Sequence, residues 1–433
     1  MDELIPRHAL SLAREHLSLF PGLVVEGARQ VGKSTLAAVL VEGRDATVLN
    51  LDDEPTRTAA VSDPQWFVAQ AGTGTLVIDE VQRVPELTLA VKAAIDRDRR
   101  PGRFVLTGSA SLLRVRGLAD SLVGRVGRLT LLGLSQGERL RQPDDFVAAA
   151  AAALAEGRDE PLTELTSQVA RDDYADLVCV GGYPSVQGLP ERSRRLWFDA
   201  YVDGLVHRDL GELRREYDPR RAMAVLRSLA ARPSAELVKA KIAQEAELPA
   251  STVTGYLDLL EAVGLTAVLP SWTTNLTKRQ TRRTKALLLD SGLAARLSRL
   301  TADQLGQVQY SESFGALLES FVTAELLKQR TWSSEEYELF HYRDRDGSEV
   351  DLVAELSDGR VIGIEVKAST TYRGDQFNGL RTLRDLLGDR FAGGFVLSTA
   401  SAGYRYADRL YGLPVSALWS LGSAPSDDSS DAT

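Results

Sequence analysis

A glycine-bounded loop between an apolar stretch and a helical pattern constrains this chain more than any other feature. Residues 23–26 have the apolar character of a buried strand, and residues 27–34, Gly-Ala-Arg-Gln-Val-Gly-Lys-Ser, fit G-x-x-x-x-G-K-[ST] at every required position. Glycines at both ends let backbone N–H groups face phosphate oxygens, and a helix expected over residues 33–41 directs its positive end at them. The loop predicts a phosphate-binding site in an α/β domain.

Four further apolar stretches continue the alternation of strand and helix. We expect strands at residues 47–51, 75–79, 103–107 and 128–132, separated by helical patterns. Continuous apolar strands alternating with helices are typical of a parallel sheet covered on both faces. Residues 1–140 are therefore predicted to form an α/β parallel-sheet P-loop domain.

The loop residues have distinct chemical roles. The Lys33 ammonium would contact the β- and γ-phosphates, and the Ser34 hydroxyl would bind Mg²⁺. The residues predicted to contact nucleotide are the whole run Gly27, Ala28, Arg29, Gln30, Val31, Gly32, Lys33, Ser34 and Thr35. ATP and Mg²⁺ are the predicted cofactors.

An acidic pair follows the third expected strand. Asp79 and Glu80 come about 45 residues after the loop, where ligands of such sheets bind. We expect Asp79 to hold Mg²⁺, directly or through water, and Glu80 to polarise the attacking water. A glutamate after the aspartate favours hydrolysis over nucleotide binding alone.

Polar and basic residues complete the predicted catalytic set. Thr107 and Ser109 follow the fourth strand and are candidates to sense the γ-phosphate, although a simple turn is the alternative. Arg125, followed by Arg128, is the candidate for stabilising transition-state charge, whereas the alternative is a solvated surface arginine. If such an arginine acts from a neighbouring subunit, the chain must form a homo-oligomer.

Composition limits the other function classes. The formal net charge is −9, so any contact with nucleic acid must be a local patch. The single cysteine, Cys179, excludes an internal disulfide framework and a cysteine-based zinc cluster. No apolar run approaches 18 residues and no signal peptide is apparent, so we expect a cytoplasmic protein without a membrane span.

The chain divides into further segments after residue 140. Residues 141–232 are expected to form a linker and helical region, because an alanine run with flanking prolines and acids suggests a connecting segment with an exposed helix. Residues 233–300 are expected to be winged-helix-like, and residues 301–422 a mixed α/β domain. Residues 423–433, rich in Ser, Asp and Ala, are expected to be disordered.

The middle of the chain has a helix-turn-helix pattern over residues 234–264. A basic wing follows, and its predicted nucleic-acid contacts are Lys278, Arg279, Arg282 and Arg283. The second helix carries Asp258 and Glu261 but no Lys or Arg, which disfavours sequence-specific reading of DNA. Nonspecific backbone contact through the wing and a structural or protein-contact role both stay open.

The motifs together resemble a known group. They lie at residues 27–34, 49–52, 79–82, 106–109, 181–184, 207–209, 285–293, 349–351 and 365–367. The sequence is similar to bacterial and archaeal AAA-type ATPases whose C-terminal half is a domain of unknown function with a nuclease-like fold. The resemblance implies ATP binding and hydrolysis, a winged-helix-like middle and a PD-(D/E)xK-like end.

Two expected strands near the C-terminus bring acids together. A hairpin centred on Asp358 places Asp351 opposite Glu365, and Glu349 opposite Lys367. Facing carboxylates repel unless a cation or a proton lies between them, and an adjacent lysine could position water. These residues predict a metal site at Asp351 and Glu365, suited to phosphodiester cleavage with Lys367.

Glu319, on a helix expected over residues 311–329, matches the extra acid often found on the first helix of such nucleases. The alternative interpretation is a salt-bridge ladder on a solvated sheet face. The leading hypothesis couples ATP-driven change to a nuclease-like domain that acts on or binds DNA or RNA. The rival is an ATP-dependent switch whose degenerate nuclease-like domain binds protein partners.

Overall fold

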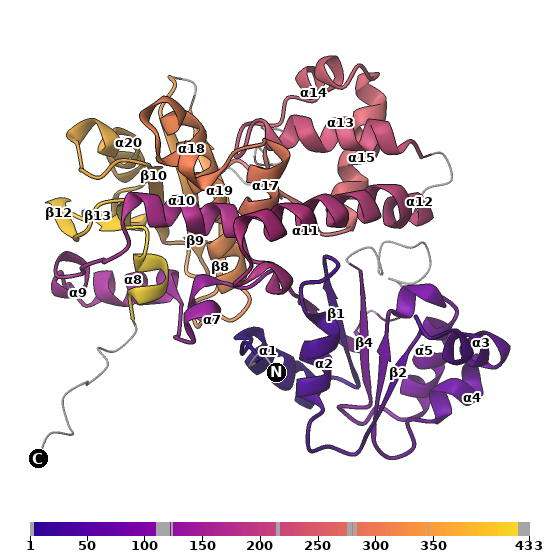
Figure 1. Cartoon of the computed structure of the whole chain (residues 1–433). Coiled ribbons are helices and arrows are strands. Elements are labelled where there is room, and N and C mark those ends of the chain that lie inside the picture. Colours follow the sequence, from indigo (N-terminus) through magenta and orange to yellow (C-terminus); the bar gives the residue numbers. More distant parts are fainter. Residues whose placement is uncertain are drawn as a thin grey trace, which may run out of the picture.

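Figure 1 shows the computed structural model of the chain, coloured along the sequence. The structure describes residues 4–109, 122, 124–213, 217–274, 279, 284–344 and 346–422. The expected disordered tail, residues 423–433, lies outside the described residues. None of the helices in these ranges has the length and apolar character needed to cross a membrane.

The N-terminal module contains a five-stranded parallel sheet in the order β2-β3-β4-β1-β5. All five predicted strands are present within two residues at each end. The elements are α1 (Ala9–Leu19), β1 (Gly22–Gly27), α2 (Lys33–Leu40), β2 (Ala46–Asn50), α3 (Glu54–Ser62), α4 (Pro64–Ala69), β3 (Thr75–Asp79), α5 (Leu87–Arg97), β4 (Phe104–Ser109) and β5 (Val126–Thr130).

Burial differs between the strands of this sheet. Strands β1 and β3 are buried along their whole length, which explains their unbroken apolar sequences. Strand β2 is an edge strand with Val48 55% exposed, so the expectation that both faces are covered is wrong for this strand. The carboxyl ends of β1, β3 and β4 meet at one edge because the strands are parallel neighbours.

The middle of the chain is helical and packs over that edge (Figure 1). Its elements are α10 (Arg171–Val180), α11 (Glu191–Gly204), a π-helical turn (Leu205–Asp209), α12 (Leu210–Leu213), α13 (Pro219–Ala230), α14 (Lys239–Glu245), α15 (Ala250–Ala262), β6 (Thr266–Leu269), β7 (Lys285–Leu288), α17 (Ser291–Leu297) and α18 (Ala302–Gly306).

The expected helix pair corresponds to α14 and α15, and β6 pairs antiparallel with β7. The apolar stripe of α15 is buried at Val253 and Leu260, while Leu257 is half-buried. The winged-helix assignment stays a prediction, because residues 275–278 and 280–283 of the wing are outside the described ranges.

The C-terminal module is a six-stranded mixed sheet in the order β12-β13-β11-β10-β9-β8. Its elements are α19 (Ser311–Gln329), β8 (Tyr337–Arg343), β9 (Glu349–Leu356), β10 (Val361–Lys367), α20 (Asn378–Leu387), β11 (Phe391–Ser398), β12 (Tyr404–Ala407), β13 (Leu410–Pro414) and α21 (Ala417–Ser420). The predicted hairpin register is confirmed where Leu352 pairs with Ile364 and Glu355 with Val361.

The alanine-rich segment is not an exposed connection. Residues Phe146–Ala155 form helix α8, which packs against β11 and α19, and the short helix α9 (Glu160–Thr163) packs beside β12 and β13. The absence of a side chain at Gly393 of β11 makes room for Leu154 of α8, because a Cβ there would lie 2.6 Å from Leu154 Cδ1. The chain therefore enters the C-terminal layer, leaves it to form the helical region, and returns at α19.

Candidate active site

The loop after β1 is shaped by residues with positive φ. Gly32 has φ 98° and Gln30 has φ 64°. A Cβ on Gly27 would lie only 2.1 Å from the Leu131 carbonyl oxygen, so the strand end tolerates no side chain. Helix α2 starts at Lys33 with Gly32 as its N-cap, which leaves the first backbone N–H groups without a side-chain cap. This geometry is that of an anion-binding loop.

Lys33 is buried inside the loop that carries it. Its Nζ donates to the carbonyl oxygens of Gly27, at 3.2 Å, and Ala28, at 2.9 Å. Burial lowers the pKa of Lys33, and the negative charges of Glu80 and Asp79 oppose this shift. An ammonium bonded to two neutral carbonyls can exchange them for phosphate oxygens, which are charged and bind it more strongly.

Asp79, the last residue of β3, bonds one residue of helix α2 and one residue of the neighbouring strand β4. Its Oδ1 accepts hydrogen bonds from Ser34 Oγ at 3.0 Å and from the Thr107 hydroxyl. The Thr107 oxygen in turn accepts from the backbone N–H of Glu80 at 3.3 Å. A hydroxyl and a carboxylate side by side are the hard oxygen ligands that suit Mg²⁺. The side chain of Ser109 lies outside the described residues.

Glu80 follows with a strained backbone. It has φ 57°, which is uncommon for a residue other than glycine and is found at functional sites. Its carboxylate accepts a hydrogen bond from the side-chain amide of Gln82. Glu80 lines a small chamber together with Arg29, Lys33, Gln82 and Arg83. Gln82 belongs to the motif at residues 79–82 but had no predicted role, and Arg83 was missed, although it follows the acidic pair within three residues.

The two candidate arginines for transition-state charge are held by carboxylates of their own module. Arg125 contacts Asp96 of α5 through Nε at 2.7 Å and Nη2 at 3.1 Å. Arg128 contacts Glu26 of β1 through Nη2 at 3.1 Å. Neither appears among the residues that line the chamber, so a catalytic role for either stays a prediction.

The helical region contacts the loop directly. Arg29 Nη1 donates to Asp209 Oδ1 at 2.8 Å, and the Tyr201 hydroxyl donates to the Arg29 carbonyl oxygen at 3.4 Å. Tyr201 also accepts from the Tyr183 hydroxyl at 2.9 Å. Two sequence motifs therefore lie beside the P-loop: residues 181–184, which are expected to form a structural turn, and residues 207–209, which have no predicted role.

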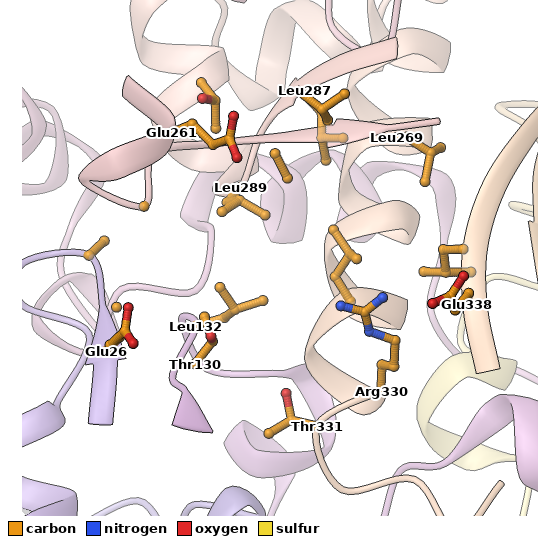
Figure 2. A pocket seen from close by; sticks show the side chains of 18 of the residues that line it. Glu26, Thr130, Leu132, Glu261, Leu269, Leu287, Leu289, Arg330, Thr331 and Glu338 are labelled. Carbon is orange, nitrogen blue, oxygen red and sulfur yellow. The ribbon is translucent and has the colours of Figure 1, made fainter. Parts of the chain in front are cut away.

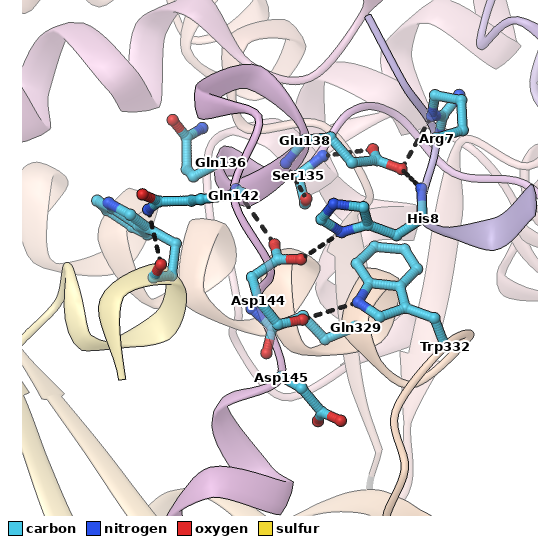
Figure 3. Close-up of polar contacts among 12 residues, drawn as sticks. Arg7, His8, Ser135, Gln136, Glu138, Gln142, Asp144, Asp145, Gln329 and Trp332 are labelled. Atoms are coloured by element: carbon cyan, nitrogen blue, oxygen red, sulfur yellow. Dashed lines mark hydrogen bonds and ion pairs between the residues drawn. The ribbon is translucent and has the colours of Figure 1, made fainter. Parts of the chain in front are cut away.

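The back of the loop is tied to the C-terminal module through a polar junction (Figure 3). Arg7 donates to the Val31 carbonyl at 2.7 Å and to Glu138 Oε1 at 3.1 Å. His8 Nδ1 lies 2.6 Å from Asp144 Oδ1, and the Asp144 carbonyl accepts from Trp332 Nε1 at 2.7 Å. Burial tends to lower the pKa of His8, but Asp144 raises it overall. The N-terminal segment thus bridges the loop and the end of α19.

A cavity of about 540 Å³ lies where the three modules meet. Figure 2 shows Glu26 and Leu132 from the N-terminal module, Leu289 from the middle, and Arg330 and Glu338 from the C-terminal module around it. The P-loop residues Gly27 and Ala28 also line it. The loop is therefore in reach of all three modules.

The structure brings the four predicted nuclease residues together. Glu365 Oε2 accepts from the Asp351 backbone N–H at 3.3 Å, and Asp351 Oδ2 accepts from the Val366 N–H at 2.9 Å. Lys367 Nζ lies 2.6 Å from Glu365 Oε1 and 3.8 Å from Asp351 Oδ2. Glu319 joins them from α19. We call Glu319, Asp351, Glu365, Lys367 and Lys285 the carboxylate cluster.

Lys285 is the member that sequence reasoning placed elsewhere. Its Nζ lies 2.6 Å from Glu319 Oε1 and 3.9 Å from Asp351 Oδ1. The sequence suggests a basic wing around Lys285, but this residue begins strand β7 and points at the acids. The expected pairing of Glu349 with Lys367 stays a prediction, and Glu349 forms an ion pair with Arg343 of β8 at 2.7 Å.

Burial and mutual repulsion perturb the carboxylate cluster. Burial, reinforced by the charge of Asp351, raises the pKa of Glu319 to about 8 and that of Glu365 to about 7. Burial alone would lower the pKa values of Lys285 and Lys367, but the neighbouring carboxylates raise both. Among the described residues, no group of three or more His, Cys, Asp or Glu has the geometry to hold a metal ion.

The one described residue of the predicted nucleic-acid wing is turned into the protein. Arg279 donates to both oxygens of Glu355, at 2.6 and 2.9 Å, and its guanidinium lies 4.8 Å from the centre of the Phe340 ring. Its side chain is only 12% exposed, so the expected contact with nucleic acid does not fit this position. Lys278, Arg282 and Arg283 lie outside the described residues.

Three stretches of the chain match protein families. Residues 20–140 match a family described as an AAA domain. Residues 171–304 and 314–418 match two families, each described as a domain of unknown function (DUF8612 and DUF4143). The first match supports an AAA-type ATPase domain around the P-loop.

Two relatives match most of the chain, and each is described as an uncharacterized protein. The chain is 29% identical over 370 residues to uncharacterized proteins of Mycobacterium bovis and Mycobacterium tuberculosis, which covers 84% of this chain and 74% of theirs. Among solved structures, the Walker-type ATPase PABY2304 of Pyrococcus abyssi is 16% identical, with a TM-score of 0.42 over 68% of this chain and 96% of that chain.

Proposed function

We propose that this protein binds and hydrolyses ATP with Mg²⁺. The observation that carries the proposal is the arrangement at the end of β3, where Asp79 bonds Ser34 and Thr107 while Lys33 is held by loop carbonyls. An AAA domain match over residues 20–140 supports it. ATP is the nucleotide class that such a domain typically uses.

The residues divide the chemistry among them. Ser34 and Asp79 would hold Mg²⁺, which when bound neutralises phosphate charge. The backbone N–H groups of the loop and the Lys33 ammonium bind the phosphates and stabilise charge that builds up on them. Glu80 lines the chamber beside Lys33 and accepts a proton from the attacking water. Thr107 orients both acids, because it bonds the Asp79 carboxylate and the Glu80 N–H.

Phosphate release by the purified full-length protein tests this proposal. The variant Lys33→Ala should reduce ATP turnover by about 100-fold or more, since it removes the only lysine of the phosphate loop. Lys92→Ala is the matched control, because Lys92 lies on α5 of the same module and does not line the chamber. Normal phosphate release from Lys33→Ala would refute the assignment.

The carboxylate cluster supports two roles that an experiment separates. Convergence of Asp351, Glu365, Glu319 and Lys367 supports phosphodiester cleavage. In the present arrangement these acids do not have the geometry of a metal site, so cleavage would require them to rearrange around a divalent ion. Direct bonding of Lys285 and Lys367 to these carboxylates supports instead a degenerate, neutralised site in an interaction domain. In both roles, a change of the bound nucleotide would reach the C-terminal module through the polar junction that links Arg7 to the end of α19.

Cleavage of labelled DNA and RNA with Mg²⁺ or Mn²⁺ distinguishes the two. A nuclease site predicts cleavage by the wild type that is lost in Asp351→Asn and in Lys367→Met. Glu338→Gln, a change at an exposed acid of β8, is the control. Cleavage that persists in Asp351→Asn would remove the cluster from consideration, and a wild type that never cuts would favour the interaction role.

A further inference from the structure

The helical region places an acid on the P-loop itself. Asp209 ends the π-helical turn Leu205–Asp209, and its carboxylate is 18% exposed. Its Oδ1 accepts from Arg29 Nη1 at 2.8 Å and from Arg208 Nε at 3.1 Å. Arg29 is the third residue of the loop. A loop cation is therefore held by a carboxylate that belongs to a different module.

This ion pair borders the chamber that contains the catalytic groups. Arg29 and Asp209 line it together with Lys33, Glu80 and Arg83. On the proposed function, Lys33 and Glu80 mark where the terminal phosphate of ATP lies. An anion in that position is attracted to Arg29 and repelled by Asp209.

The cover of the chamber comes from the helical region. Leu205 and Val263 are 2% and 4% exposed, and both line the chamber beside Asp209. π-helical turns are uncommon and frequently occur at functional sites. If Asp209 loses Arg29 as its partner, the contact between the P-loop and the helices that cover the chamber changes.

We propose that Asp209 makes the site discriminate triphosphate from diphosphate. Arg29 stays on Asp209 when the site is empty or holds ADP, and Arg29 transfers to the γ-phosphate when ATP binds. The transfer breaks the side-chain bond between the helical region and the loop and weakens that contact, while the bond from Tyr201 to the Arg29 carbonyl can persist. This proposal rests on the proposed ATPase function. By linkage, a partner that binds better when the helical region is held away from the loop raises the affinity for ATP. The factor equals that by which ATP raises the affinity for the partner.

The test measures dissociation constants for ATP and ADP in a Glu80→Gln background, where hydrolysis does not obscure binding. Asp209→Asn keeps the size of the side chain and removes its charge. It should increase the affinity for ATP relative to ADP by about fivefold or more. Asp203→Asn is the matched control, because Asp203 is a 75% exposed acid of α11 that pairs with His207.

Arg29→Ala completes a double-mutant cycle. In the Arg29→Ala background, Asp209→Asn should change the ATP-to-ADP ratio by no more than about twofold. An unchanged ratio in Asp209→Asn, or equal losses of ATP and ADP affinity as expected for a purely structural residue, would overturn the proposal. A full effect of Asp209→Asn without Arg29 would also overturn it. Absence of any nucleotide binding would instead refute the nucleotide site and this inference with it.

Discussion

The P-loop site and the carboxylate cluster use similar side chains in different ways. In the P-loop site, Lys33 bonds two backbone carbonyls, and the neighbouring acids bond hydroxyl and amide groups. In the carboxylate cluster, Lys285 and Lys367 bond the carboxylates themselves. The first arrangement can give up its neutral partners to a charged ligand, whereas the second is neutralised from within.

The largest expected difference between the two sites concerns turnover of ATP. Glu80→Gln should lower phosphate release by about 100-fold or more while ATP binding is kept, because the amide cannot accept the proton of water. Glu365→Gln makes the same chemical change in the carboxylate cluster and should leave phosphate release unchanged. Steady-state phosphate release and equilibrium binding of ATP measure the two effects.

The outcome decides which acid belongs to the ATPase. Equal turnover in Glu80→Gln and wild type would contradict the role of Glu80. A loss of turnover in Glu365→Gln at normal stability would show that the comparison is wrong and that the C-terminal module takes part in the reaction.

A smaller effect is expected in the pH dependence of stability. Glu319 and Glu365 have pKa values raised to about 8 and about 7 by burial. Between pH 5 and 8 the folded protein therefore binds protons that the unfolded chain has released, and the free energy of unfolding falls as pH rises. Urea unfolding should show that Glu319→Gln reduces this decline by on the order of 1 kcal/mol.

The exposed Glu338 supplies the control for this measurement. Glu338→Gln should leave the slope of stability against pH as in the wild type. A wild-type stability that rises between pH 5 and 8 would contradict the buried, partly protonated state of the cluster.

The sequence predicted the N-terminal sheet well because local signals and the fold agree there. Strands β1 and β3 are buried on both faces and are apolar throughout, and the loop motif is contiguous from Gly27 to Ser34. The hairpin of Asp351 and Glu365 was also predictable, because period-two alternation and a turn at Asp358 define its register.

Features that depend on tertiary contacts were not predictable. Helix α8 consists largely of alanines, and its sequence does not distinguish an exposed helix from one packed against Gly393. Lys285 and Arg279 fall in one basic stretch, yet each is paired with a different acid of the C-terminal module. The Arg29–Asp209 pair joins residues 180 positions apart, and no local pattern marks such a contact.

The most direct measurement of the central claim is a crystal structure with Mg²⁺ and a nonhydrolysable ATP analogue. We predict that the triphosphate lies on residues 27–34 and that Lys33 Nζ leaves the carbonyls of Gly27 and Ala28 for phosphate oxygens. A triphosphate bound elsewhere, or a saturated crystal in which Lys33 keeps both carbonyl bonds and no phosphate lies on the loop, would contradict it.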